Sequence, residues 1–240
     1  MSALLADPTL ALAAEVVDDL ERVRIANENR LRSLTDPEIY GLTIQHPDVL
    51  ALTGLVEQLK DSEKQATKHL EKVMARHPLG TWVKGATGVG YKQAARLLAA
   101  LGDPYWNDLY DRPRTFDELC AFSGLSIKSG KAVHRSRGVQ SNWNPDARMR
   151  LWLVAQSCIK TKGEYRQVYD AGRERYADAV HVVECQRCGP KGKPAQPGSP
   201  LSAGHQHARA TRLIVKAVLK DLWQASRACH ATAQPQKEGK

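Results

Sequence analysis

Two runs of mostly apolar residues, spaced alternately by three and four positions, dominate the first third of the chain. The first run is Val16, Leu20, Val23, Asn27, Leu31 and Leu34, and the second is Leu52, Leu55, Leu59, Ser62, Ala66, Leu70 and Val73. This spacing is typical of helices that pack along a heptad seam, where a polar residue such as Asn27 can fix the register. The intervening TDPEIYGLTIQHPD contains two prolines and a glycine, which must break the helix. Residues 9–75 are therefore predicted to form two long helices joined by a bend.

A pair of helices with about three heptads each is only marginal as an independent coiled coil. The pair could be an oligomerisation arm that joins two copies of the chain into a homo-oligomer. It could equally be a plain helical hairpin that packs on the rest of the protein. Both interpretations make residues 1–78 a helical arm, and we expect a coiled-coil arm over this range.

The remainder of the chain also has helical signals, so we expect an all-α fold. Residues 91–101 are rich in Ala and Leu, and Gly102 fits the position just after that helix. Thr115 and Glu118 form the capping-box pattern of a short helix. Residues 146–180 are predicted to form one or two helices, and residues 207–229 a strongly amphipathic one. A basic helical domain is thus expected over 79–229, with a loop insertion at 184–207 and a disordered polar tail over 230–240.

The net charge of +9 is unevenly distributed along the 240 residues. Residues 1–75 carry 8 Lys/Arg and 13 Asp/Glu, a net charge of −5, which leaves +14 for residues 76–240. An acidic helical part followed by a basic part favours a nucleic acid as the partner. No run reaches about 18 apolar residues, and the start lacks the basic segment of a signal peptide. We therefore expect a cytoplasmic protein that does not enter a membrane.

The segment TGVGYKQAARLLAALG has the pattern of a helix-hairpin-helix element that binds DNA phosphates. Gly88 and Gly90, on either side of Val89, allow a tight turn and a close approach of the backbone to a ligand. Their N–H groups would lie at the start of the next helix, where the helix dipole favours an anion, and Lys92 adds a positive charge. The alternative is a structural joint in which glycine serves only close packing.

A second basic segment begins with LSIKSGKAVHRSRG at residues 125–138. Its cations, with those just beyond it, are Lys128, Lys131, Arg135, Arg137, Arg148 and Arg150, opposed only by Asp146. Such a loop is expected to contact phosphates. A serine within it could act as a nucleophile, but His134 is the only nearby base to take its proton. Composition alone therefore favours a serine that donates a hydrogen bond to phosphate.

A third candidate site is the segment CQRCGPKGKPAQPGSPLSAGHQH. Two thiolates, Cys185 and Cys188, and two imidazoles, His205 and His207, can complete a tetrahedral zinc site. Because the H-x-H spacing is unusually tight, only one of these histidines need bind, and His181 is then an alternative fourth ligand. A structural Zn²⁺ would account for a long Pro/Gly-rich loop without a core of its own. The alternative is a metal-free thiol pair in a flexible loop.

The order of these motifs resembles the C-terminal half of the insertion-sequence transposases that use a bridge RNA. The family pattern is a helix-hairpin-helix, an aromatic-x-G-L segment, an S-G dipeptide, and an asparagine before an Arg-bearing helix. It matches Gly88 and Gly90, then Phe122, Gly124 and Leu125, then Ser129 and Gly130, and finally Asn144 and Arg148. The resemblance covers roughly residues 10–160, and it implies that Ser129 corresponds to the family's nucleophile.

Two departures from that family temper this implication. Trp143 replaces the glycine that usually precedes the asparagine, and no acidic RuvC-like domain is recognised in the sequence. The first hypothesis is therefore a DNA-binding protein of transposase or recombinase type. A rival is an active recombinase component in which Ser129 attacks a phosphodiester while a partner supplies Mg²⁺-binding acids. A third is a regulatory factor that binds RNA.

Overall fold

The computed structural model describes residues 4–128, 130–189 and 193–233. These residues form eight α-helices and two short two-stranded antiparallel hairpins, so the predicted all-α class is confirmed. None of the helices in the described ranges combines the length and the apolarity needed to cross a membrane.

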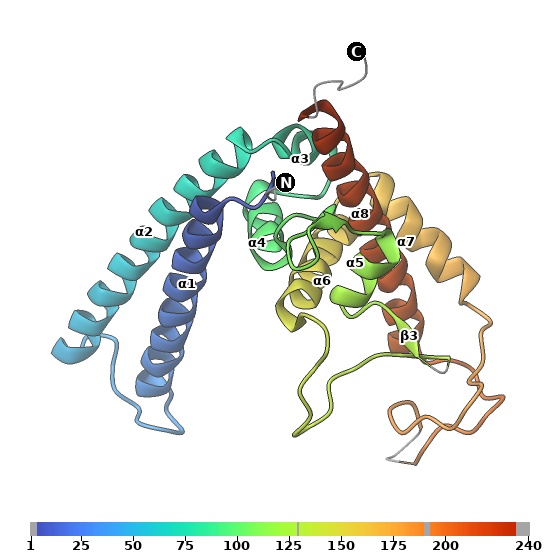
Figure 1. Cartoon of the computed structure of the whole chain (residues 1–240). Coiled ribbons are helices and arrows are strands. Elements are labelled where there is room, and N and C mark those ends of the chain that lie inside the picture. The colour runs from blue at the N-terminus through green and yellow to red at the C-terminus, as the bar shows by residue number, and fades with distance from the viewer. Residues whose placement is uncertain (1–3, 129, 190–192, 234–240) are drawn as a thin grey trace.

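Helices α1 (Pro8–Thr35) and α2 (Pro47–Arg76) form an antiparallel arm that projects from the body of the protein (Figure 1). Asp7 caps α1 by accepting hydrogen bonds from the backbone N–H groups of Thr9 and Leu10. Of the two prolines expected to break the helix, Pro37 lies in the turn after α1, as predicted. Pro47 is instead the first residue of α2, where the backbone N–H that proline lacks would have no partner within the helix. The two long helices and the bend between them are as the spacing predicts.

The arm does not bury one continuous seam. In α1 the buried residues are Leu10, Ala14 and Val17, whereas Val16 and Val23 of the heptad pattern are exposed. The reason is that the start of α1 packs against both α2 and α4 (Tyr91–Leu101), which pulls a different face inward. Along α2 only the last part of the pattern, including Leu70 and Val73, is buried.

Ion pairs join the arm to the body. The side chain of Arg96, in the middle of α4, is buried and pairs with Asp18 and Glu21 of α1. Arg150 also pairs with Asp18. The Nζ atom of Lys92 lies 3.5 Å from a carboxylate oxygen of Glu63. These acids of the arm therefore neutralise several cations of the basic part.

The body is a layered set of helices around one apolar core. It comprises α3 (Gly80–Gly85), α4, α5 (Phe116–Phe122), α6 (Pro145–Lys160), α7 (Glu164–Arg175) and α8 (Ala203–Ala233). Helix α6 packs between α4 and α8, and α8 also contacts α5 and α7. Fully buried leucines from these layers, including Leu97, Leu151 and Leu219, meet in the core. The capping box of Thr115 and Glu118 is present at the start of α5, as the sequence predicts.

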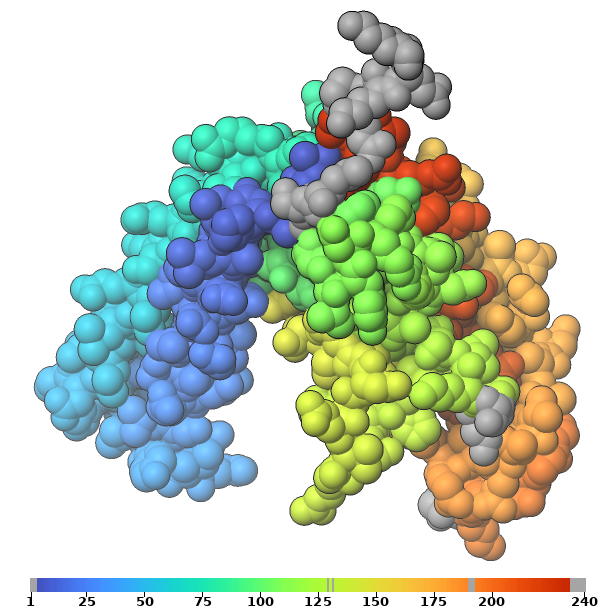
Figure 2. All heavy atoms as spheres, viewed as in Figure 1, coloured from blue at the N-terminus to red at the C-terminus, as the bar shows by residue number. Residues whose placement is uncertain are grey.

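Two hairpins interrupt the helices. Strand β1 (Trp106–Asn107) pairs with β2 (Arg112–Pro113), and β3 (Ile127–Lys128) pairs with β4 (Lys131–Ala132). The second hairpin leads into an extended loop over residues 133–143. Figure 2 shows this loop, in yellow-green, facing the blue arm across an open notch.

The C-terminal helix is longer than expected. It continues through Ala233, so residues 230–233 do not belong to a disordered tail. His230 is buried because its ring stacks on Trp106 and its Nε2 lies 2.6 Å from a carboxylate oxygen of Asp103. The rest of the predicted tail, 234–240, lies outside the described residues.

Candidate nucleic-acid interface

The G-x-G turn connects α3 to α4 as a helix-hairpin-helix would require. Val89 is buried beneath the turn, and Gly90 is the residue that precedes α4. In the described ranges, no side chain caps the first N–H groups of α4. Helix α4 is eleven residues long, and the free N–H groups at its start are available to an anion.

Gly88 has a packing role within this turn. Its φ of +94° favours glycine, and a Cβ there would lie 2.9 Å from the Cα of Cys158 in α6. Gly163 makes a similar close approach, because a Cβ there would lie 2.7 Å from a methyl group of Thr87. Gly90 by contrast has a φ of −80° and open space around it. Of the two glycines, Gly90 is the one left free to face a ligand.

The cations near the turn differ from those expected. The side chain of Lys92, which was expected to contact phosphate, instead forms an ion pair with Glu63 of the arm. Lys84, at the end of α3, and Lys160 and Lys162, where α6 ends, are exposed. Within the described residues none of these three lysines pairs with an acid. Sequence reasoning missed them, although the KTKG segment was a signal that it could have used.

The basic loop presents a second exposed cationic surface, which we define as Lys128, Arg135 and Arg137. All three side chains are exposed, and none has an acidic partner in the described part of the chain. Two other predicted contacts on this loop cannot be placed. Ser129 lies outside the described residues, as does the side chain of Lys131.

Asn144 and Arg148, which the sequence suggests as DNA contacts, are engaged within the protein. Asn144 caps α6 by accepting from the N–H groups of Asp146 and Ala147, and its amide donates to the carbonyl of Ala100. Arg148 donates to the carbonyl of Val133 at 2.6 Å, and its guanidinium lies over the ring of Trp143. Burial and the neighbouring Arg212 lower the pKa of Arg148. Both residues hold the base of the loop in place.

The position of Trp143 explains why the aromatic-x-G-L segment has a glycine at residue 124. A Cβ at Gly124 would lie 2.5 Å from the Trp143 ring, and Gly124 has a φ of +68°. The indole therefore lies directly on the glycine backbone. The backbone N–H of Asn144 also donates to the carbonyl of Phe122, which ties the start of α6 to the end of α5.

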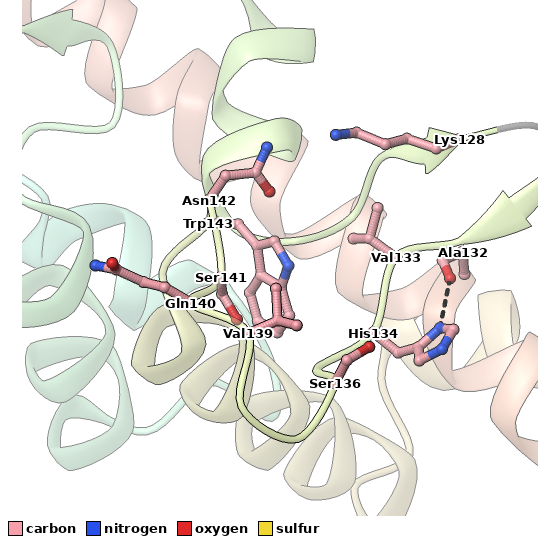
Figure 3. Close-up of a pocket in the computed structure, with 10 residues that line it drawn as sticks. All are labelled: Lys128, Ala132, Val133, His134, Ser136, Val139, Gln140, Ser141, Asn142 and Trp143. Atoms are coloured by element: carbon pink, nitrogen blue, oxygen red, sulfur yellow. Dashed lines mark hydrogen bonds between the residues drawn. The ribbon is translucent and has the colours of Figure 1, made fainter.

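A pocket of about 290 Å³ lies between the β3–β4 hairpin and the start of α6 (Figure 3). Its lining includes Lys128, His134, Ser136, Gln140 and Trp143. The Nδ1 atom of His134 lies 3.3 Å from the carbonyl oxygen of Ala132, so this ring is held by its own hairpin. An indole, polar side chains and a lysine together are the kinds of group that contact nucleotides.

The cysteines fall into two groups. Burial raises the pKa of Cys158 to about 11 and also raises the pKa of Cys120 and of the half-buried Cys229, which suits unreactive thiols. A hydrogen bond with Ser202 lowers the pKa of Cys188. Burial, followed by the proximity of His181, lowers the pKa of His205.

The predicted metal ligands are brought together only in part. The ligand atoms of His181, Cys188 and His205 all lie within 4.8 Å of one another. Cys185 is not one of these three residues, but it lies one turn before Cys188, whose backbone N–H donates to the Cys185 carbonyl oxygen at 3.5 Å. His207 lies elsewhere, because its Nδ1 is 2.9 Å from the Tyr169 hydroxyl.

Residues 81–170 match the model of the transposase IS116/IS110/IS902 family. This range runs from α3 through most of α7, so it contains the G-x-G turn, the basic loop and the pocket. The match supports a transposase-type domain in this part of the chain. Searches of curated proteins and of solved structures found no significant match.

Proposed function

We propose that the chain is a DNA-binding protein of transposase type that grips the phosphate backbone of a duplex. The observation that carries this proposal is the separation of paired from unpaired cations. Arg96, Arg150 and Lys92 are neutralised by the arm, whereas Lys128, Arg135 and Arg137 project from the loop without an acidic partner among the described residues. Unpaired, exposed cations on a transposase-type domain are suited to phosphate contacts.

Two surfaces would contact the duplex in this proposal. The loop cations form one, and the exposed start of α4 at Gly90, with Lys84, Lys160 and Lys162 nearby, forms the other. Because phosphate contacts carry no base code, we expect binding with little sequence preference. The polar pocket beside Trp143 would then accommodate part of a nucleotide near the loop.

Neutralising the loop surface tests the proposal. The triple variant Lys128→Gln/Arg135→Gln/Arg137→Gln should weaken duplex binding and flatten its dependence on salt. Each lost phosphate contact lowers the slope of log K against log salt by about 0.9, so the slope should fall by up to about 3. Fluorescence anisotropy of a labelled duplex, titrated from about 50 to about 200 mM salt, measures this.

A matched control carries the same change of charge on the arm. Lys64→Gln/Lys68→Gln/Lys72→Gln removes three exposed lysines from α2 and should leave both affinity and slope almost unchanged. Equal weakening in the two triple variants would show that only net charge matters and would contradict the proposed surface. Tighter binding of an RNA duplex of the same length would favour the RNA-binding alternative.

We also propose that the arm joins two copies of the chain. Its outer half holds an apolar groove of about 780 Å³ between α1 and α2, lined by residues that include Leu31, Leu34, Leu52, Leu55 and Leu59. Leu55 is 55% exposed, so the heptad residues that fail to pack within one chain remain available to a second. A dimer would place two basic surfaces on one DNA.

The oligomer is tested by placing a charge in the groove. Leu55→Glu should halve the mass measured by light scattering while leaving the helical content intact, because the side chain is exposed in the single chain. Leu12→Glu is the control, since Leu12 is exposed on α1 but does not line the groove. A wild-type mass equal to one chain would refute the proposal.

Attack of Ser129 on a DNA phosphodiester stays a prediction, because that residue lies outside the described ranges. Its proposed role as a nucleophile would require Mg²⁺-binding acids from a partner.

A further inference from the structure

The segment between α7 and α8 is held mainly by its backbone. His181 donates to the carbonyl of Ser199, and Cys185 exchanges two hydrogen bonds with Ala195, each of 2.9 Å. In the described part of this segment, the buried apolar side chains are Ala195 and Leu201. So little apolar burial is weak support for a long loop, and such loops commonly depend on a cross-link or a metal.

The backbone pairing brings three metal-binding side chains to one place. His181 and Cys188 come from the loop, and His205 comes from the first turn of α8. The Sγ of Cys188 lies 3.3 Å from Nδ1 of His205, and the two imidazole centroids are 5.4 Å apart. A tetrahedral Zn²⁺ with ordinary bond lengths holds a sulfur and a nitrogen ligand about 3.5 Å apart. The distance between Cys188 and His205 therefore already suits the ion.

His181 supplies an independent observation. The residue is only 4% exposed, and its Nε2 atom is buried without a hydrogen-bond partner among the described residues. A buried nitrogen left unpaired costs about 1–3 kcal/mol, and native proteins seldom tolerate that cost. A metal ion coordinated by this nitrogen would satisfy it.

A cluster held by hydrogen bonds alone, without a metal, explains the positions of these side chains less completely than a metal site does. Cys188 also lies 3.0 Å from the Ser202 hydroxyl, so hydrogen bonds account for Cys188 and His205. They leave Nε2 of His181 unexplained. In the metal site Ser202 would instead support the thiolate, as residues around metal ligands commonly do.

We infer that His181, Cys188 and His205, with Cys185 as the fourth ligand, bind one structural Zn²⁺ that fastens the α7–α8 segment to the start of α8. The C-x2-C spacing brings Cys185 within one turn of Cys188, which is the usual way two sulfurs share one ion. Two thiolates balance the charge of the ion, and four protein ligands leave no open position for catalysis. This inference does not depend on DNA binding, since the site lies outside the range that matches the transposase family.

His207 is excluded from the site by the geometry of α8. Residues two apart on a helix point about 200° away from each other, so His205 and His207 cannot face the same ion. His207 faces Tyr169 and Thr211 instead. It is therefore the matched control for His205.

The test uses the full chain, purified without a histidine tag, and measures zinc by elemental analysis. We expect one zinc per chain in the wild type and in His207→Gln, and loss of most of it in His181→Gln and Cys188→Ser. Replacement of zinc by Co²⁺ should give a sulfur-to-cobalt charge-transfer band that Cys185→Ser weakens by about half, because that band scales with the number of thiolates. X-ray absorption of the wild-type zinc protein should show two sulfur and two nitrogen neighbours.

Removal of the ion has an expected structural consequence. A chelator should make residues 177–202 sensitive to limited proteolysis while the helical core resists, because the core is built from other residues. Absence of zinc from the wild type, a nitrogen-only or oxygen-only coordination shell, or equal zinc content in His181→Gln and wild type would each overturn the inference. The absorption experiment keeps the test decisive should a ligand variant fail to fold.

Discussion

Asp103→Ala is expected to lower the free energy of unfolding by about 3–5 kcal/mol, as removal of one partner from a buried charged network does. The Asp103 carboxylate is fully buried and accepts hydrogen bonds from the backbone N–H groups of Leu5, Tyr105 and Trp106. It also accepts from the Ser226 hydroxyl and lies 2.6 Å from Nε2 of His230. The substitution would leave the N–H groups of Leu5 and Trp106 and the Nε2 of His230 without this partner, whereas the N–H of Tyr105 keeps the Ser226 hydroxyl as an acceptor. Chemical denaturation followed by circular dichroism measures the loss.

Asp108→Ala is the control for this prediction. Asp108 lies in the same loop, but it is exposed, so its loss should change the free energy of unfolding by no more than about 0.5 kcal/mol. Asp103→Ala should in addition loosen the end of α8, because Ser226 and His230 both belong to that helix. Hydrogen exchange that stayed slow near His230, together with a stability loss below about 1 kcal/mol, would contradict a joining role for Asp103.

The acids around Asp103 show where the sequence stops being informative. From the sequence, Asp103, Asp108, Asp111, Asp117 and Glu118 form one group of ordinary loop and cap residues. The structure separates Asp103 from the rest, because its partners come from the N-terminus and from α8, more than 90 residues away in either direction. No local pattern encodes such a contact. The length of α8 beyond the polar-looking His230 was missed for the same reason.

Local rules, in contrast, performed well within single elements. The bounds of α4 at Tyr91 and Leu101, the glycine that follows it and the capping box of α5 were all predicted from neighbouring residues. The heptad rule placed the two arm helices but not their buried faces. The heptad pattern assumes that each helix packs against one partner, whereas α1 packs against both α2 and α4, so a different face is buried.

In the candidate sites too, the sequence predicts local features but not contacts between distant residues. Residue type and spacing found the C-x2-C pair and the G-x-G turn. They could not select His181 over His207, which depends on where α8 begins and on a backbone pairing across the loop. Nor could they show that Lys92 meets Glu63 and that Arg148 covers Trp143, because both contacts belong to the folded chain.

Gly88→Ala is expected to destabilise the protein by about 2–4 kcal/mol. At a φ of +94° an alanine is strained, and its Cβ would lie 2.9 Å from the Cα of Cys158. Backbone of α6 cannot move aside as a flexible side chain could. For a domain of this size the melting temperature should fall by about 4–16 °C, measured by thermal denaturation.

Gly90→Asp separates packing from DNA binding in the same turn. Gly90 has an ordinary φ of −80°, and apart from its chain neighbours no atom of the described residues lies within 4 Å of where a Cβ would be, so the variant should fold. An aspartate at this position is a good cap for α4 and should leave the melting temperature unchanged or slightly raised. Its carboxylate would also occupy the N–H groups that we propose for a phosphate and would repel the DNA, so duplex affinity should fall.

The two glycine variants together decide what the turn does. A stable Gly90→Asp protein with weakened DNA binding supports the phosphate contact at the start of α4. Unchanged DNA affinity in that variant, alongside a destabilised Gly88→Ala, would mean that the turn is a structural joint between α3, α4 and α6. DNA binding would then depend on Lys128, Arg135 and Arg137, whose triple variant tests that surface separately.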